Sequence, residues 1–396
     1  MKTVELVYFN AGGGHRAAAQ ALMALARKQQ RPWQVRLTHL FEVLDPHRRF
    51  QAWTGMAPEA YYNARLARGW TLGLEQELKV LQAGIRVLHP TLVRRLQQHW
   101  ATSESDLVVS LVPNFNRAIG ESLASTLPGV PFMTVLTDLA DLPPSFWIEP
   151  SVDPHVVCGT ARAATQALDA GCRPDHVHRV SGMILRPEFH EPCTIDRDGE
   201  RQRHGLEPMA MTGVVMFGGH GSAEMLEVAQ ALPEVPLILL CGHNQRLAAR
   251  LQAMPARAPR VVVGFTPDVR HWLQLGDFFI GKPGPGSLSE ALQCGLPVVL
   301  TRNRRTMPQE RFNTEWVQQR GLGVVIQRYT ELPAAMASLR EQMPAWQGRV
   351  RAQRNEAAAE VMDLIARLLD DTRVLSPGGA EIETSLNCRH PVMRAS

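Results

Sequence analysis

The sequence predicts an α/β protein in which two Rossmann-like, parallel-sheet domains face each other across a central cleft. Three observations support this fold class. The chain has 396 residues, which is enough for two domains of typical size. Short apolar stretches alternate with helical segments along most of it, as is typical of parallel sheets. Glycine-rich turns follow several of these stretches, at the carboxyl ends of strands where open parallel sheets bind ligands.

The first half of the chain opens with a strand, a glycine turn and a helix. We expect the strand at residues 4–9, the turn at 10–15 and an alanine-rich helix at 17–28. Further strands are expected at residues 34–37, 107–112, 131–136 and 155–158, and a further helix at 162–170. These elements indicate an N-terminal Rossmann-like domain over residues 1–186.

A second set of elements repeats this architecture but not its sequence. Its strands are expected at residues 213–217, 237–240, 260–263, 277–280 and 297–300. We expect an interdomain connection at 187–208, where the chain is polar and punctuated by proline, and a C-terminal domain at 209–345. Residues 346–371 are expected to form helices that pack on a domain surface, and residues 372–396 a loose tail.

The composition is that of an ordinary soluble globular protein, with 45% hydrophobic and 20% charged residues. A net charge of +4 is too small to indicate a nucleic-acid partner. Six cysteines are scattered without metal-ligand spacing and are interpreted as reduced thiols. Since no apolar run reaches the roughly 18 residues that cross a bilayer, we expect a cytoplasmic protein that is peripheral at the inner face of the cytoplasmic membrane.

The most informative segment is GKPGPGSLSEALQCGLP at residues 281–297, a glycine-rich turn between a buried strand and a helix. Backbone amides of Gly284, Gly286 and Ser287, the positive end of the helix and the Lys282 ammonium favour a phosphate or pyrophosphate. Glu290, one turn into the helix, could accept hydrogen bonds from a sugar diol. An ordinary structural turn is the alternative. The spacing matches neither a P-loop nor GxGxxG on the first strand, which argues against a P-loop NTPase and a simple dehydrogenase.

Other candidate ligand residues follow further strands of the second half. One turn offers a second anion site at a helix start, and an aromatic ring could lie against a nucleobase. Polar side chains in a later loop could bind sugar hydroxyls. These candidates are Gly218, Gly219, His220, His243, Phe265, Gln309 and Glu310. Helix caps, core packing and an ordinary polar loop are the structural alternatives for them.

Catalytic candidates come from the first half. His15 closes the turn of Gly12, Gly13 and Gly14 at a helix start, where the helix dipole favours a neutral imidazole that can act as a general base. A capping histidine is the alternative. Asp138 follows a strand directly and is expected to face the cleft. No metal site is expected, because the only DxD, at 196–198, lies in the polar connection and is assigned to solvent.

One stretch of the first half interleaves cations with aromatic residues. This mixture suits an anionic membrane surface, although a solvated helical segment is the alternative. The residues are Arg48, Arg49, Trp53, Tyr61, Arg65, Arg68 and Trp70.

Taken together, the motifs resemble a family. The segments GGGHRAAAQAL from Gly12, TVLTDL from Thr134, GGHGS from Gly218 and CGHN from Cys241 recur, in this order, in GT-B glycosyltransferases. So do KPGPGSLSEALQCGLPVVL and PQERFNTEWV, which begin at residues 282 and 308. The group contains the monogalactosyldiacylglycerol synthases, the processive diacylglycerol glucosyltransferases and the bacterial peptidoglycan N-acetylglucosaminyltransferase, and the likeness is strongest to the first of these.

The resemblance implies an inverting transfer of a hexose from a UDP-sugar to a lipid hydroxyl, with no cofactor besides the donor. By position, Glu290 would bind the ribose, Gly219 and the turn at 284–287 the diphosphate, and Phe265 the uracil. Gln309 and Glu310 would bind the sugar, and His15 would face the acceptor in the first domain. The expected partners are thus a UDP-hexose, a lipid acceptor of the diacylglycerol type and an anionic membrane surface.

The chain also departs from the family pattern. His-Pro pairs that the family often carries are absent at residues 112–116 and 142–147, and His243 stands where arginine is usual. Most of these differences fall on the acceptor side, so the identity of the lipid stays open. The hexose also stays open, because one or two loop residues separate galactose from glucose in the family. A UDP-N-acetylglucosamine 2-epimerase and a non-catalytic module that binds nucleotide sugars or lipids are the alternative functions.

Overall fold

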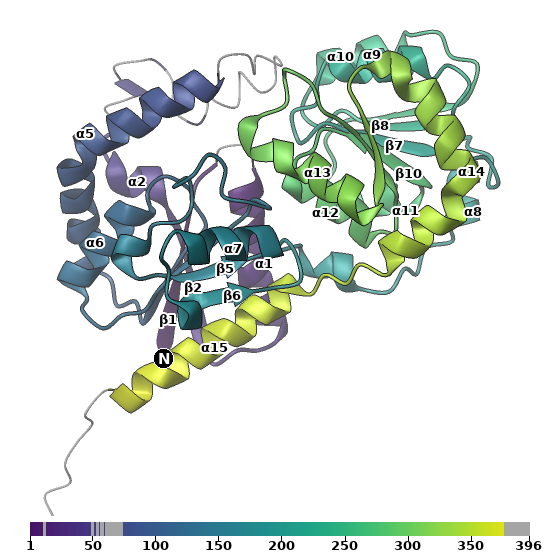
Figure 1. Cartoon of the computed structure of the whole chain (residues 1–396). Helices are drawn as coiled ribbons and strands as arrows, with labels where there is room; N and C mark the ends of the chain where they lie inside the picture. Colours follow the sequence, from purple (N-terminus) through teal and green to yellow (C-terminus); the bar gives the residue numbers. More distant parts are fainter. Residues whose placement is uncertain (11–12, 49–50, 53–54, 56–58, 60–73, 376–396) are drawn as a thin grey trace, which may run out of the picture.

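The computed structural model describes residues 1–10, 13–48, 51, 52, 55, 59 and 74–375, and it has two lobes (Figure 1). Each lobe is built around a six-stranded sheet in which every neighbouring pair of strands is parallel. The predicted fold class, an α/β protein with two parallel-sheet halves, is therefore confirmed.

The first lobe has the strand order β2-β1-β3-β4-β5-β6. The predicted strands are present within a few residues of their expected ends, and β6 is an edge strand that the sequence did not predict. The strands are β1 (Lys2–Tyr8), β2 (Trp33–His39), β3 (Leu107–Ser110), β4 (Phe132–Val135), β5 (His155–Cys158) and β6 (Val177–Arg179). The helices are α1 (Gly14–Lys28), α2 (Leu40–Leu44), α5 (Leu74–Trp100), α6 (Asn116–Thr126) and α7 (Ala161–Asp169), with short 3-10 turns at Pro150–Val152 and Pro174–His176.

The second lobe has the order β12-β11-β10-β7-β8-β9. Its strands are β7 (Gly213–Met216), β8 (Leu237–Leu240), β9 (Arg260–Val263), β10 (Phe278–Gly281), β11 (Val298–Thr301) and β12 (Gly323–Ile326). Its helices are α9 (Glu224–Ala231), α10 (Gln245–Gln252), α11 (Val269–Gln274), α12 (Pro285–Gln293), α13 (Arg311–Arg320) and α14 (Leu332–Arg351), with 3-10 turns at Pro308–Glu310 and Tyr329–Glu331.

The strand orders fix where ligands can enter. In the first sheet the order reverses between β1 and β3, and in the second between β7 and β10. At such a switch point the loops leave the two central strands in opposite directions and open a crevice at their carboxyl ends. In the first lobe His15 lies at this point, at the start of α1, and in the second lobe the loops carry Gly218 and Lys282.

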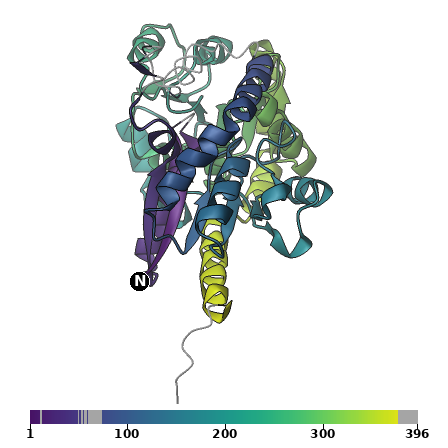
Figure 2. The ribbon, with the colours of Figure 1, turned by 90° about the vertical axis from the view of Figure 1, so that its left-hand side faces the viewer.

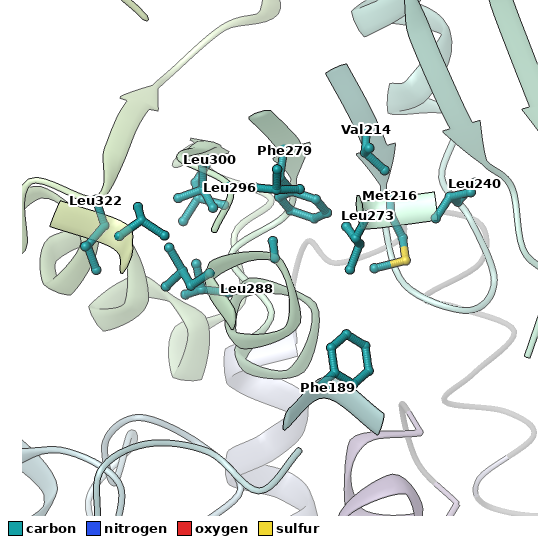
Figure 3. Close-up of a cluster of buried hydrophobic side chains, with 14 of the residues drawn as sticks. Phe189, Val214, Met216, Leu240, Leu273, Phe279, Leu288, Leu296, Leu300 and Leu322 are labelled. Carbon is teal, nitrogen blue, oxygen red and sulfur yellow. The ribbon is translucent and has the colours of Figure 1, made fainter. Parts of the chain in front are cut away.

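The connection between the lobes is more structured than the sequence predicts. It contains a 3-10 turn at Pro187–His190 and the helix α8 (Arg197–Arg203). Phe189 of the 3-10 turn is buried against the core of the second lobe, which Figure 3 shows with Leu288 of α12 and Leu273 of α11 nearby. The fully buried Arg201 donates to Asp277 at 2.6 Å and to the Leu275 carbonyl at 2.9 Å, so α8 is anchored to the second lobe.

The last helix, α15 (Ala357–Leu375), returns to the first lobe. Figure 1 shows it leaving the end of α14 and running along the first lobe, and Figure 2 shows the same helix, in yellow, at the lower end of that lobe. Val361 and Ile365 are buried in the same core as Leu22 of α1. The expected boundary at residue 345 falls inside α14, which buries Val350 beyond it, and the boundary at 371 falls inside α15, which runs to Leu375. The division into domains stays a prediction.

Among the described helices, none combines the length and the apolar character that a bilayer crossing requires.

Candidate active site

His15 lies at the crevice of the first lobe, in the first turn of α1. Its Nδ1 is 2.9 Å from the Leu111 carbonyl oxygen and 2.9 Å from the Thr137 hydroxyl oxygen. Because a carbonyl can only accept, we assign the ring proton to Nδ1, which leaves Nε2 as the basic nitrogen. Burial lowers the pKa of His15 to about 4, and the hydrogen bond to Leu111 opposes this only in part. The imidazole is therefore neutral, as predicted, with burial as the largest cause.

Two aromatic rings hold the imidazole of His15. The ring centroids of Phe9 and Trp147 lie 4.5 Å and 5.7 Å from it. Trp147 is fully buried and is itself fixed, since its indole N–H donates to Asp138 Oδ2 at 2.9 Å. The ring thus has one orientation relative to the crevice.

Asp138 follows β4 and is buried in the wall next to His15. Burial raises the pKa of Asp138 to about 7, although the indole of Trp147 lowers it. Glu310 and Lys282 of the second lobe also act on this pKa, the first raising it and the second lowering it. Asp138 is therefore close enough to the second lobe to sense its charges, as expected for a residue that faces the cleft.

Asp141 is a wall residue that the sequence reasoning missed. Its carboxylate accepts backbone N–H groups of Ser145 at 3.0 Å and Trp147 at 2.7 Å, which folds the loop that carries Trp147. Burial raises the pKa of Asp141 to about 6 against these hydrogen bonds. A second aspartate three residues after Asp138 was the available signal.

In the second lobe, two glycine turns pack backbone to backbone. Gly218 and Gly242 adopt left-handed φ values of 78° and 56°, and a Cβ on Gly242 would lie 2.1 Å from the Gly219 carbonyl oxygen. The His243 N–H donates to that oxygen at 3.0 Å. Only glycine at position 242 permits this approach, which brings the turns after β7 and β8 together.

The turn after β7 differs in one respect from the prediction. Helix α9 begins at Glu224, with Ala223 as its N-cap residue, so the helix starts later than the expected anion site at Gly218 and Gly219. Between them, the Ser222 hydroxyl accepts the Glu224 N–H at 3.3 Å. Gly219 and His220 therefore lie in a turn several residues before the helix. The backbone amides of this turn are separate from the free amides of the first turn of α9.

The turn after β10 keeps the predicted anion-binding geometry. Gly284 caps α12 and Pro285 is its first residue, so the N–H groups of Gly286 and Ser287 belong to the first turn, where helical partners are missing. Lys282 Nζ donates to Glu310 Oε1 at 2.8 Å. The positive helix end and a lysine thus lie at the switch point of the second sheet.

The loop before α13 packs directly against this turn. Glu310 is buried under Lys282, and the Asn313 side-chain amide donates to the Pro283 carbonyl at 2.6 Å. Gln309 is half-buried beside them, and its side-chain amide donates to Met307 Sδ at 3.7 Å. The structure therefore brings together the expected phosphate turn and the expected sugar loop.

Glu290 is partly exposed on α12, with its side chain 21% accessible. Burial raises the pKa of Glu290 to about 7, against the opposing effect of the Arg186 guanidinium. Nη2 of Arg186 lies 4.0 Å from Oε1 of Glu290. Arg186 also donates to the Pro267 carbonyl at 3.0 Å, so it links Glu290 to the loop after β9. Arg186 is the last residue of the expected first domain, and no sequence signal marked it.

Phe265 lies on the surface, 61% exposed, on the loop after β9. The imidazole of His243 stacks on it with a centroid distance of 4.0 Å and an interplanar angle of 15°. The alternative reading of Phe265 as a core residue is therefore wrong, and the pair forms an open aromatic platform.

Several predicted residues lie outside the described part of the chain. They are Gly12 of the first turn and Arg49, Trp53, Tyr61, Arg65, Arg68 and Trp70 of the expected membrane surface. Gly13 and Gly14 are described and precede His15, and Arg48 has a positive φ of 50°. At the DxD, Asp196 is exposed and caps α8 through the Gly199 N–H.

A groove of about 820 Å³ runs between the lobes beside this site. The first lobe contributes Leu78 and Gln82 of α5 and Leu142 of the Asp141 loop, and the second contributes Phe312 and Trp316 of α13. Its lining mixes apolar and cationic side chains.

No model of a protein family matches the chain. Among curated proteins, it is 29% identical over 346 residues to the probable chloroplastic monogalactosyldiacylglycerol synthase 2 of rice (Oryza sativa subsp. japonica), covering 82% of this chain and 70% of the rice protein. It is 26% identical over 355 residues to the chloroplastic synthase of spinach (Spinacia oleracea), covering 85% of this chain and 65% of the spinach protein.

Solved structures show the same fold. MurG of Acinetobacter baumannii matches with a TM-score of 0.58 at 15% identity, over 93% of this chain and all of MurG. HepE of Anabaena, in complex with UDP, matches with 0.54 at 17% identity, over 94% of this chain and 100% of HepE. A putative UDP-N-acetylglucosamine 2-epimerase from Listeria monocytogenes matches with 0.58 at 13% identity, over 94% and 98%. The GT-B fold, the resemblance to the monogalactosyldiacylglycerol synthases and the assignment to the glycosyltransferase enzymes are thereby confirmed.

Proposed function

We propose that the protein transfers a hexose from a UDP-sugar to the hydroxyl of a lipid of the diacylglycerol type, with inversion at the anomeric carbon. One observation carries the proposal: a neutral, oriented imidazole on one wall of the cleft stands opposite an anion-binding turn on the other. The relatives named as galactolipid synthases and the UDP complex of HepE support the choice of acceptor and donor.

His15 supplies the base in this mechanism. Nε2 takes the proton of the acceptor hydroxyl while the oxygen attacks the anomeric carbon from the side opposite the departing UDP. A neutral imidazole is required for this step, and burial of His15 keeps the ring in that form. General base catalysis of this kind contributes about 10²- to 10⁴-fold to a rate.

The second lobe receives the charge that develops on UDP. The turn after β10 has a positive electrostatic potential. It is produced by the amides of Gly286 and Ser287, by the N-terminal end of α12 and by Lys282. Glu290 then binds the ribose, and the Phe265–His243 platform lies against the uracil. Gln309 and Glu310 bind the hexose. Because Lys282 donates a hydrogen bond to Glu310, it links the sugar loop to the diphosphate.

The lipid side of the proposal rests on an exposed apolar face of α5. Val80, Leu81, Val87 and Leu88 are 72%, 51%, 80% and 55% exposed, although large apolar side chains are normally covered. Residues 78–100 contain four Lys or Arg and no Asp or Glu. An apolar strip with basic neighbours suits the surface of an anionic bilayer, such as the inner face of a cytoplasmic membrane. Since α5 also lines the groove, a lipid could pass from one to the other.

Flotation with anionic liposomes tests this surface. The wild-type protein should float, and a variant with Leu81→Ser, Val87→Ser and Leu88→Ser should not. Met209→Ser is the matched control, because Met209 is 94% exposed on the second half of the chain. Flotation that persists in the α5 variant, or that the control abolishes, would refute the α5 surface.

The reaction itself is tested with purified protein, UDP-glucose or UDP-galactose, and diacylglycerol in vesicles. We expect UDP release that depends on the lipid, with a hexosyl-lipid of β configuration from an α-linked donor as the product in mass spectrometry and NMR. An epimerase would instead convert a UDP-sugar without any acceptor, and a non-catalytic module would bind the donor without releasing UDP. Either result would overturn the proposal.

A further inference from the structure

We propose that Glu200, His204 and His271 form a binding site for a divalent transition-metal ion, and that Zn²⁺ is the ion it suits. Glu200 lies on α8, His204 directly follows that helix, and His271 lies on α11. One potential ligand atom from each residue lies within 4.8 Å of the others. The site is separate from the proposed transfer reaction and does not depend on it.

The spacing within the cluster is wrong for hydrogen bonds and right for a shared ion. Glu200 Oε2 is 3.9 Å from His204 Nε2 and 4.0 Å from His271 Nε2, beyond the range of about 2.7–3.2 Å for a hydrogen bond. Because the three ligand atoms all lie within 4.8 Å of one another, an ion equidistant from them would be about 2.5 Å or less from each, near zinc distances of about 2.0–2.2 Å. Small side-chain rotations would close the difference.

The second oxygen of the carboxylate is already engaged. Glu200 Oε1 accepts a hydrogen bond from the Arg203 guanidinium at 2.5 Å. This bond engages Oε1 and leaves Oε2 as the oxygen nearer to both imidazoles. A hydrogen-bonded carboxylate that presents one oxygen is a common arrangement among metal ligands.

The two helices that carry the ligands are fixed to each other. Arg197 donates to the Gln274 carbonyl at 3.1 Å, which joins α8 to the end of α11. Trp272 contacts both histidines, with its ring centroid 4.7 Å from that of His204 and 5.3 Å from that of His271. The imidazoles are therefore held in place by packing before any ion binds, which lowers the cost of binding.

The donor set indicates the kind of ion. Two imidazoles and one carboxylate suit Zn²⁺ and its neighbours in the first transition row, whereas Mg²⁺ and Ca²⁺ prefer oxygen ligands only. The side chains of Glu200, His204 and His271 are 20%, 32% and 23% exposed, so an ion could enter from solvent and keep water as a further ligand. A bound ion would cross-link the interdomain connection to α11, the helix that follows the Phe265 loop.

Zinc binding to the full chain tests the site. The protein is stripped with a chelator, and Zn²⁺ is titrated in competition with a chromophoric chelator. We expect about one equivalent to bind, and Glu200→Gln, His204→Ala and His271→Ala each to weaken it about tenfold or more. His47→Ala is the matched control, since His47 is exposed and distant in sequence. Zn²⁺ should also raise the thermal midpoint of the wild type, and not that of the three variants.

The same titration can overturn the proposal. Zinc that binds all three variants as tightly as the wild type would assign the ion to other residues. A wild-type protein that takes up no zinc in competition with the chelator, and whose thermal midpoint zinc leaves unchanged, would remove the site altogether. Thermal unfolding without zinc shows whether each variant is folded, and Glu200→Gln preserves the shape of the side chain that it replaces.

Discussion

The two walls of the cleft differ in the burial of their functional groups. The wall of the first lobe is dry: Asp138 and Asp141 are buried, their carboxyl pKa values are raised, and the pKa of His15 is lowered. The wall of the second lobe is made of turns that carry the first-turn amides of α12, the half-buried Lys282 and the exposed Phe265. Burial tunes proton affinity on one side, and exposed dipoles and charge attract an anion on the other.

This difference assigns separate tasks to the two lobes. A proton acceptor benefits from a desolvated, rigid setting, because the neutral form of an imidazole is favoured there. A diphosphate needs donors that already point at it and a path from solvent. We therefore expect substitutions in the first wall to change turnover, and substitutions in the second to change the affinity for UDP. The predictions below test that division.

The largest effect is expected from His15→Ala. Loss of the base should lower kcat about 10²- to 10⁴-fold, measured as UDP release in the presence of lipid vesicles. His47→Ala, which changes an exposed histidine outside the cleft, should leave kcat unchanged. Turnover of His15→Ala close to that of the wild type would exclude the proposed base.

Lys282→Met should act on the other wall. Losing a charged donor to the diphosphate should weaken UDP binding about 10- to 100-fold, the equivalent of roughly 1.5–3 kcal/mol. Because this change also leaves the buried Glu310 without its lysine, Glu310→Gln should be added in a second variant. That double variant should recover thermal stability and not UDP affinity; recovered affinity would show that Lys282 only neutralises Glu310.

Phe265→Ala should cost about tenfold in UDP affinity, since stacking on a base contributes about 1–3 kcal/mol. Because Phe265 is largely exposed, the thermal midpoint of Phe265→Ala should equal that of the wild type. Phe265→Tyr keeps the ring and should bind UDP as the wild type does. Unchanged affinity in the alanine variant would remove the platform from the donor site.

Asp138→Asn should give the smallest effect on binding and a clear one on pH dependence. The carboxyl pKa is about 7 in the fold and about 3.9 in an unfolded chain, so the folded form binds the extra proton and wild-type stability should fall as pH rises from about 5 to 8. Asparagine does not titrate, so the stability of the variant does not fall with pH for this reason. Its thermal midpoint, relative to the wild type, should therefore rise between pH 5 and pH 8, and parallel curves would contradict the raised pKa.

The sequence predicts the strands well because each is a short, continuous apolar run, as in residues 213–216 and 237–240, and both faces of a parallel strand are buried. The glycine turns and His15 are visible for a similar reason: strand, turn and helix are local features. What the sequence does not predict depends on packing. Asp141 matters through the loop that it folds, and Arg186 through the Pro267 carbonyl and Glu290, far away along the chain.

The second kind of miss concerns pairings across elements. Lys282 and Glu310 were assigned to separate tasks, yet they form an ion pair. The cluster of Glu200, His204 and His271 was not expected, because its third member comes from a different helix. Spacing rules detect ligands on one helix and cannot show which helix packs beside it.

The division between the walls is tested most directly by calorimetric titration of UDP into the wild type, His15→Ala and Lys282→Met. UDP carries the diphosphate and the base without the reacting sugar, so it reports on the second wall alone. The account predicts that His15→Ala binds UDP within about threefold of the wild type while Lys282→Met binds at least about tenfold more weakly. Equal losses in both variants, or a loss confined to His15→Ala, would contradict it.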